Sequence, residues 1–96
     1  MDGRNPREKK ILKEDLTERL ISQGRVIPEN PVRISKVRRW AMEEEEERIN
    51  ELLNELVSEA DSIEYYEKEQ KCIGIVDLES AREYLDNIQQ TPWFEV

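Results

Sequence analysis

The stretch from Pro31 to Gln70 constrains the fold more than any other, because its charge and its hydrophobic period both change along its length. Residues 31–40 are basic and rich in β-branched side chains, whereas residues 43–47 are five consecutive glutamates. Beyond them, apolar residues recur at the i, i+3, i+4 and i+7 positions of one helix face: Ile49, Leu52, Leu53, Leu56, Val57, Ala60 and Ile63. This pattern predicts a long, acidic central helix that ends near Gln70.

Two structures remain open for the beginning of this segment. In the first, Asn30 caps and Pro31 begins a single helix that continues to about residue 70. In the second, residues 32–40 form a short β-hairpin wing and the helix begins near Glu43. The Ser-Lys pair at the centre of such a hairpin is poor chemistry for a two-residue turn, whereas the β-branched residues favour strands.

A further helix is predicted at residues 7–23. Asn5 and Pro6 suit the N-cap and the first helical position, and Gly24 supplies the left-handed residue that often ends a helix. A linker broken by two prolines then separates this helix from the central segment.

The C-terminal part is predicted to contain a strand or extended connector at residues 72–76 and a helix at 77–89, capped by Asp77. Charged residues make up 40% of the chain against a usual value near 25%, so the core must be small. We therefore predict one small, mainly α domain with three parts: an N-terminal helix and linker (1–30), a central segment (31–70), and a C-terminal helix with an apolar tail (77–96).

The inventory of reactive side chains argues against catalysis. The chain has no histidine and a single cysteine, Cys72, so a structural zinc site or a histidine-based triad cannot be assembled. We expect no enzymatic activity, cofactor, metal or small-molecule substrate. The polar N-terminus and the short apolar runs predict neither a signal peptide nor a membrane-spanning segment, and a lone cysteine fits the cytoplasm.

The net charge of −8 is unevenly distributed. Residues 1–40 carry 11 Lys and Arg against 6 Asp and Glu, a charge of +5, so residues 41–96 carry −13. A basic half can attract phosphate. Its candidates for nucleic-acid contact are Arg25, Arg33, Lys36, Arg38, Arg39 and Trp40. In the alternative, these arginines pair with the glutamates that follow them, and Trp40 fills the core.

The acidic half is predicted to contact protein. The candidate interface residues are Ile49, Leu53, Leu56, Ala60, Ile63, Trp93 and Phe94. The face from Ile49 to Ile63 is either the seam of a homodimer or partner complex, or the core of an intramolecular bundle. The two C-terminal aromatic residues either bind a partner or pack back onto the body of the domain.

The segment RVIPENPVR at residues 25–33, with WAMEE at 40–44, resembles the wing region of phage excisionases and related small winged-helix regulators. The resemblance covers about residues 16–49. It implies that Leu16–Gln23 is a recognition helix. It also implies that three basic residues of a wing contact phosphate or the minor groove: Arg33, Lys36 and Arg38.

We therefore expect a small, non-enzymatic regulatory protein in the cytoplasm, of phage type by resemblance. Its basic N-terminal half contacts DNA, and its acidic helical half contacts protein. The alternative is a purely protein-binding helical adaptor or inhibitor, monomeric or dimeric, with no nucleic-acid contact and no membrane association.

Overall fold

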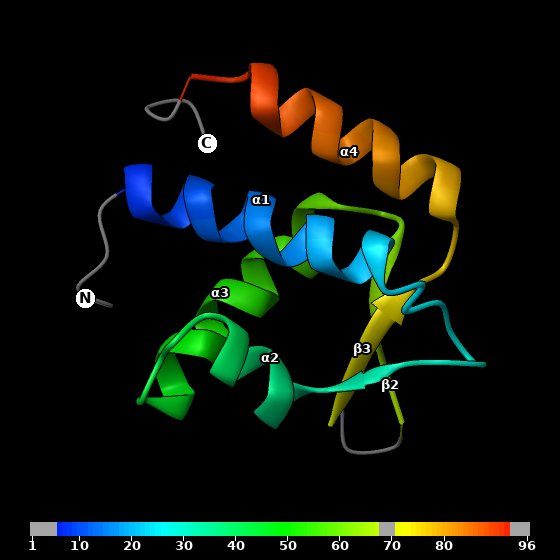
Figure 1. The fold of residues 1–96 in the computed structure, drawn as a ribbon. Helices are drawn as coiled ribbons and strands as arrows, with labels where there is room; N and C mark the ends of the chain where they lie inside the picture. The colour runs from blue at the N-terminus through cyan, green and yellow to red at the C-terminus, as the bar shows by residue number, and fades with distance from the viewer. Residues whose placement is uncertain (1–5, 68–70, 93–96) are drawn as a thin grey trace.

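The computed structural model describes residues 6–67 and 71–92. They form a mainly α domain, as predicted, in which four helices pack together with a three-stranded antiparallel sheet (Figure 1). None of the helices in these ranges has the length and apolar character needed to cross a membrane. In chain order the elements are α1 (Pro6–Ser22), β1 (Val32–Arg33), α2 (Ile34–Trp40), α3 (Glu46–Glu59), β2 (Ile63–Tyr66), β3 (Cys72–Ile75) and α4 (Leu78–Gln90).

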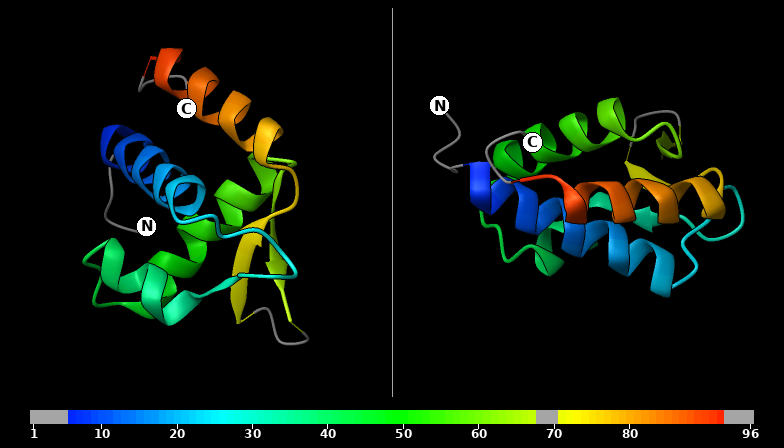
Figure 2. Two further views of the ribbon diagram at one scale, coloured as in Figure 1. Left: turned by 45° about the vertical axis from the view of Figure 1, so that its right-hand side comes forward. Right: turned by 90° about the horizontal axis from the view of Figure 1, so that it is seen from above.

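The N-terminal helix α1 agrees within one residue with the helix predicted at 7–23. Gly24 follows it with a φ of +62°, the left-handed conformation that glycine allows at a helix end. α1 packs against α4 on one flank and against α3 and β3 on the other (Figures 1 and 2). Leu16 and Leu20 are buried there, so the predicted recognition segment Leu16–Gln23 contributes its leucines to the core.

Residues 32–40 adopt neither of the two predicted structures. β1 lies beside β3, with Val32 opposite Ile73, and α2 follows directly. The backbone N–H of Ile34 donates to the carbonyl oxygen of Lys71 at 2.9 Å, which ties the start of α2 to the same strand. The predicted hairpin wing at 32–40 is wrong because the partner of β1 comes from the distant C-terminal half of the chain.

A left-handed residue separates α2 from α3, so the alternative of one helix from Pro31 is also wrong. Met42 has a φ of +54° and is 90% exposed. This conformation is unfavourable for a residue with a Cβ and interrupts a right-handed helix. α3 then begins at Glu46, close to the start near Glu43 that the shorter alternative predicted.

The central helix is shorter than predicted and ends at Glu59. The chain then forms the β2–β3 hairpin, in which Ile63 lies opposite Ile75. The strand predicted at 72–76 is confirmed as β3, the middle strand of the order β1-β3-β2. Tyr65 belongs to β2 rather than to the predicted helix, in keeping with the high strand propensity of aromatic residues.

The apolar face of α3 and of the residues after it forms the centre of the core. Six side chains on this face are at most 1% exposed: Ile49, Leu52, Leu53, Leu56, Ala60 and Ile63. Five of them were predicted as a protein interface: Ile49, Leu53, Leu56, Ala60 and Ile63. The intramolecular alternative is the one found, because the single chain already buries these side chains.

The C-terminal helix α4 matches the prediction for residues 77–89, including its cap. The carboxylate of Asp77 accepts a hydrogen bond from the backbone N–H of Glu79 at 3.1 Å. Ala81 and Ile88 are buried on its inner face. The predicted roles of Trp93 and Phe94 lie outside the described residues.

Candidate functional site

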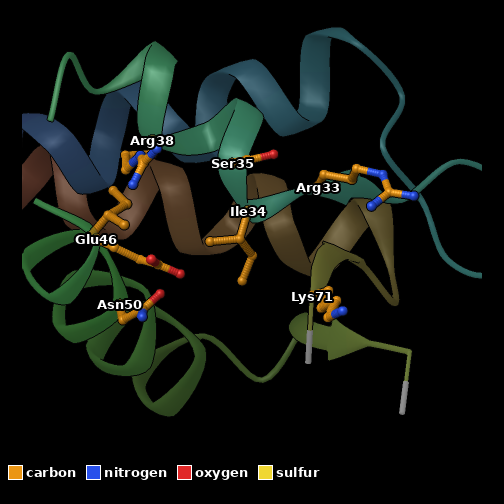
Figure 3. Close-up of a pocket in the computed structure, with 8 residues that line it drawn as sticks. Arg33, Ile34, Ser35, Arg38, Glu46, Asn50 and Lys71 are labelled. Atoms are coloured by element: carbon orange, nitrogen blue, oxygen red, sulfur yellow. The ribbon is translucent and has the colours of Figure 1, made fainter. Parts of the chain in front are cut away.

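A cavity of about 480 Å³ opens between α2, the N-terminal half of α3 and the residue that precedes β3. It is lined by basic, acidic, polar and apolar side chains from these regions and from the end of β1 (Figure 3). The lining residues are Arg33, Ile34, Ser35, Arg38, Glu46, Ile49, Asn50 and Lys71.

Two of the basic side chains meet at the cavity because their strands pair. Arg33 ends β1 and lies opposite Cys72 in the antiparallel register, and Lys71 directly precedes Cys72 in the chain. Both side chains are exposed. A third basic residue, Arg38, lies one helical turn beyond Ile34 on α2, so it borders the same opening.

The α3 side of the cavity has the opposite chemistry. Glu46 and Asn50 are one turn apart in the first half of α3, so the two side chains share a face. Figure 3 shows them on the α3 side of the opening, with Arg33 and Lys71 across from them and Ile34 between. The cavity therefore places the cations Arg33 and Lys71 opposite a carboxylate and an amide, with an apolar side chain between the two groups, whereas the third cation, Arg38, lies on the same side as Glu46.

Four basic side chains of β1 and α2 have no counter-charge in the described part of the domain. Across residues 6–67 and 71–92, the side chains of Arg33, Lys36, Arg38 and Arg39 form no ion pair and no hydrogen bond. The glutamate run instead pairs locally, as Glu45 does with Arg48 at 3.1 Å. The predicted alternative, in which these arginines pair with the following glutamates, does not describe this surface.

The exposed arc of α2 extends the basic surface beyond the cavity. Val37 is buried, whereas Lys36 and Arg39 are exposed and Arg38 is half-buried. Together with the strand residues they form what we call the basic surface: Arg33, Lys36, Arg38, Arg39 and Lys71. A cluster of positive charges of this kind attracts anions from solution.

Two of the predicted nucleic-acid contacts lie elsewhere. The guanidinium of Arg25 donates to the side-chain oxygens of Gln23 and Asn30 at 3.0 and 3.2 Å, at the opposite end of β3. Trp40 is half-buried against the core, and the guanidinium of Arg19 lies 5.8 Å from its ring centroid. Trp40 is thus held by packing and by a cation–π contact, and it does not line the cavity.

Carboxylates border the basic surface on the α3 side. Glu44, Glu45, Glu47 and Glu51 are all exposed before or along the first turns of α3. Phosphates are therefore attracted over β1 and α2 and repelled over α3. The boundary between the two regions passes through the cavity, where Arg38 and Glu46 both contribute to the lining.

Cys72 pairs with Arg33 in the sheet, directly after Lys71, and is 3% exposed. Burial raises the pKa of its thiol, and the nearby carboxylate of Glu67 raises it further, while the positive charge of Arg33 lowers it. The thiol is thus protonated at neutral pH and acts as a small apolar side chain.

The sequence identified three of the lining residues as functional candidates: Arg33 and Arg38 for nucleic acid, and Ile49 for protein. Lys71, Glu46 and Asn50 were missed because their position depends on the β1–β3 pairing and on the angle between α2 and α3. The only available signal for Lys71 was its place immediately before a predicted strand.

In the part of the chain that the structure describes, no three histidine, cysteine or acidic side chains are grouped so as to hold a metal ion. Comparisons of the chain with protein-family models, with curated protein sequences and with solved structures found no match.

Proposed function

We propose that this protein is a small, non-enzymatic regulator that binds nucleic acid through the basic surface. The observation that carries the proposal is that Arg33, Lys36, Arg38 and Arg39 have no internal partner among the described residues. Lysine and arginine side chains that neutralise phosphates release condensed counterions, which supplies most of the sequence-independent affinity for nucleic acid.

The order of the elements also supports the proposal. α2 and α3 are consecutive helices joined by residues 41–45, and the β2–β3 hairpin follows them. With β3 between β1 and β2, this order resembles a helix-turn-helix completed by a wing, a common DNA-binding arrangement. In such an arrangement α3 would be the recognition helix and the hairpin at 63–75 the wing, instead of residues 16–23 and 32–40.

The acidic surface of α3 limits how nucleic acid can be bound. A recognition helix lies in the major groove between two lines of phosphates, yet α3 exposes Glu47 and Glu51. Direct reading of base pairs by α3 would bring carboxylates close to phosphates. The proposed contact is therefore made mainly with the backbone, by β1 and α2, and not by insertion of α3.

A second candidate function is protein binding. Met42 is 90% exposed in the turn that precedes the acidic residues, and an exposed flexible methionine beside carboxylates suits a basic, apolar partner surface. In this alternative the protein is an adaptor or inhibitor without nucleic-acid contact. Binding to nucleic acid at low salt decides between the two candidates.

The test compares two double variants of equal charge by fluorescence anisotropy with labelled oligonucleotides at low salt. Arg33→Ala/Arg38→Ala removes two cations from the basic surface, whereas Arg7→Ala/Arg82→Ala removes two exposed arginines from α1 and α4. We expect the first variant to bind about tenfold or more weakly and the control to bind nearly as the wild type. Equal weakening in both variants, or no binding by the wild type, refutes the proposal.

A further inference from the structure

We infer, on the basis of the nucleic-acid contact proposed above, that the cavity between α2 and α3 receives one unpaired base. The protein accordingly prefers single-stranded nucleic acid to duplex, and among the bases it prefers those that carry an exocyclic amino group. The inference depends on the side-chain arrangement of the cavity, whereas the proposed function depends only on the basic surface.

The cavity is divided in the same way as a nucleotide. Arg33 and Lys71 lie on one side, Glu46 and Asn50 lie on the other with Arg38 beside Glu46, and Ile34 lies between the two sides (Figure 3). A nucleotide has an anionic phosphate at one end, an apolar ring face in the middle and a hydrogen-bonding base edge at the other. The cations suit the phosphate, the isoleucine suits the ring face, and the α3 side chains suit the base edge.

The volume of the cavity is also large enough for a small ligand such as a base. Sites for small ligands usually enclose about 300–1,000 Å³, and this cavity measures about 480 Å³. The cavity is open to solvent, because four of its lining residues are exposed: Arg33, Ser35, Glu46 and Lys71. A base on a continuous strand can therefore enter while its neighbours remain outside. Unstacked bases of single strands are the usual targets of side chains that read a base edge outside a duplex groove.

The charge boundary at the cavity favours one strand over two. A duplex presents two lines of phosphates across each groove, so docking one line on Arg33 and Arg38 brings the other towards Glu47 and Glu51 on α3. A single strand has one line of phosphates, which can follow the cations while its bases turn towards α3. Single-strand sites commonly combine a basic track with pockets for the bases.

Glu46 determines which base is preferred. A carboxylate accepts hydrogen bonds and donates none, so it matches the amino group at N4 of cytosine. In thymine the carbonyl oxygen O4 takes the place of this amino group and repels a carboxylate, and the one donor on this edge, N3–H, lies between two carbonyl oxygens. The amide of Asn50, one turn away, can donate to the carbonyl oxygen of cytosine. The cavity thus distinguishes cytosine from thymine through a single charged side chain.

The experiment measures dissociation constants by fluorescence anisotropy for oligo(dC), oligo(dT) and a mixed-sequence duplex, each about 12 nucleotides long. The proteins are the wild type, Glu46→Gln, and the control Glu47→Gln. Both variants remove one negative charge from exposed side chains on the first turn of α3, but only Glu46 lines the cavity.

We expect the wild type to bind oligo(dC) about fivefold or more tightly than oligo(dT), and to bind both more tightly than the duplex. Glu46→Gln should bring the oligo(dC) to oligo(dT) ratio close to one, because an amide presents both a donor and an acceptor. Glu47→Gln should keep the wild-type ratio.

Three results overturn the inference. Equal ratios in the two variants show that base choice does not depend on the cavity. Binding of the duplex as tight as that of the single strands removes the strand preference, although the proposed function survives it. No binding of any oligonucleotide by the wild type refutes both the inference and the proposed function.

Discussion

The ammonium of Lys13 lies 2.8 Å from a carboxylate oxygen of Glu59, although the lysine side chain is only 1% exposed. The other oxygen of Glu59 accepts a hydrogen bond from the hydroxyl of Tyr84 at 3.1 Å. This one carboxylate thus links α1, α3 and α4. Glu55 lies farther away, 3.8 Å from the ammonium, so Glu59 is the main counter-charge for the buried cation.

Removal of Glu59 should therefore destabilise the fold more than removal of the Lys13 ammonium, because the carboxylate that then remains is partly exposed to solvent. Glu59→Ala leaves a buried ammonium with the weaker partner Glu55, and should lower the free energy of unfolding by about 3 kcal/mol. Lys13→Met keeps an unbranched apolar stem of similar length, and should lower it by less than about 1 kcal/mol. Urea denaturation of both variants measures the difference, and an equal decrease contradicts the assignment.

Tyr84 should make the fold sensitive to high pH. Burial raises the pKa of its phenol above the ordinary value of 10.0, and the carboxylate of Glu59 raises it further. The folded protein thus retains a proton that the unfolded chain releases, so its stability is full below pH 10 and decreases as the pH rises above that value. Tyr84→Phe should reduce this decrease. Thermal melts of both proteins at neutral and alkaline pH measure the effect.

Gly74 should tolerate no side chain, because the segment at residues 25–27 crosses it closely. A Cβ at this position would lie 2.3 Å from Cγ2 of Ile27 and 3.0 Å from the carbonyl oxygen of Arg25. We expect Gly74→Ala to lower the free energy of unfolding by about 2–3 kcal/mol, as measured by urea denaturation. The control Gly24→Ala meets no atom within 4 Å, and its φ of +62° should lower it by only about 1 kcal/mol.

Short-range patterns predicted much of this fold. The apolar spacing of α3, the cap at Asp77 and the stop at Gly24 each depend on residues within one or two helical turns, and all three are confirmed. Such features are set by local backbone and side-chain chemistry, which the sequence displays directly.

The sheet was not predictable in the same way. β1 pairs with β3 although a long stretch of chain separates them, and a two-residue strand leaves almost no periodic signal. The tyrosines of β2 directly follow a strong helical pattern, and they were assigned to the end of that helix. Consequently the sequence identified Arg33 and Arg38, which are local to one basic run, and missed Lys71, which β3 carries to them.

The assignment of the α3 face to the core also predicts how the protein melts. Leu53 and Leu56 are at most 1% exposed in the single chain, so Leu53→Asp or Leu56→Asp places a carboxylate in the core without a partner and should unfold the domain. Because no second chain is needed to bury this face, the wild-type melting temperature should not depend on protein concentration. A melting temperature that rises with concentration would instead indicate an intermolecular seam.

The salt dependence of nucleic-acid binding tests the basic surface as a whole. The quadruple variant Arg33→Ala/Lys36→Ala/Arg38→Ala/Arg39→Ala removes the side chains that lack an internal counter-charge among the described residues. If each neutralises one phosphate, the slope of log K against log salt should fall by roughly one unit for each of these side chains. Affinity should fall to a similar extent for every sequence tested, because binding to phosphate carries no base information.

The four substituted side chains are exposed or half-buried, so the melting temperature of the quadruple variant should change little. An unchanged salt slope in a variant that melts like the wild type would show that nucleic acid, if bound, occupies another surface.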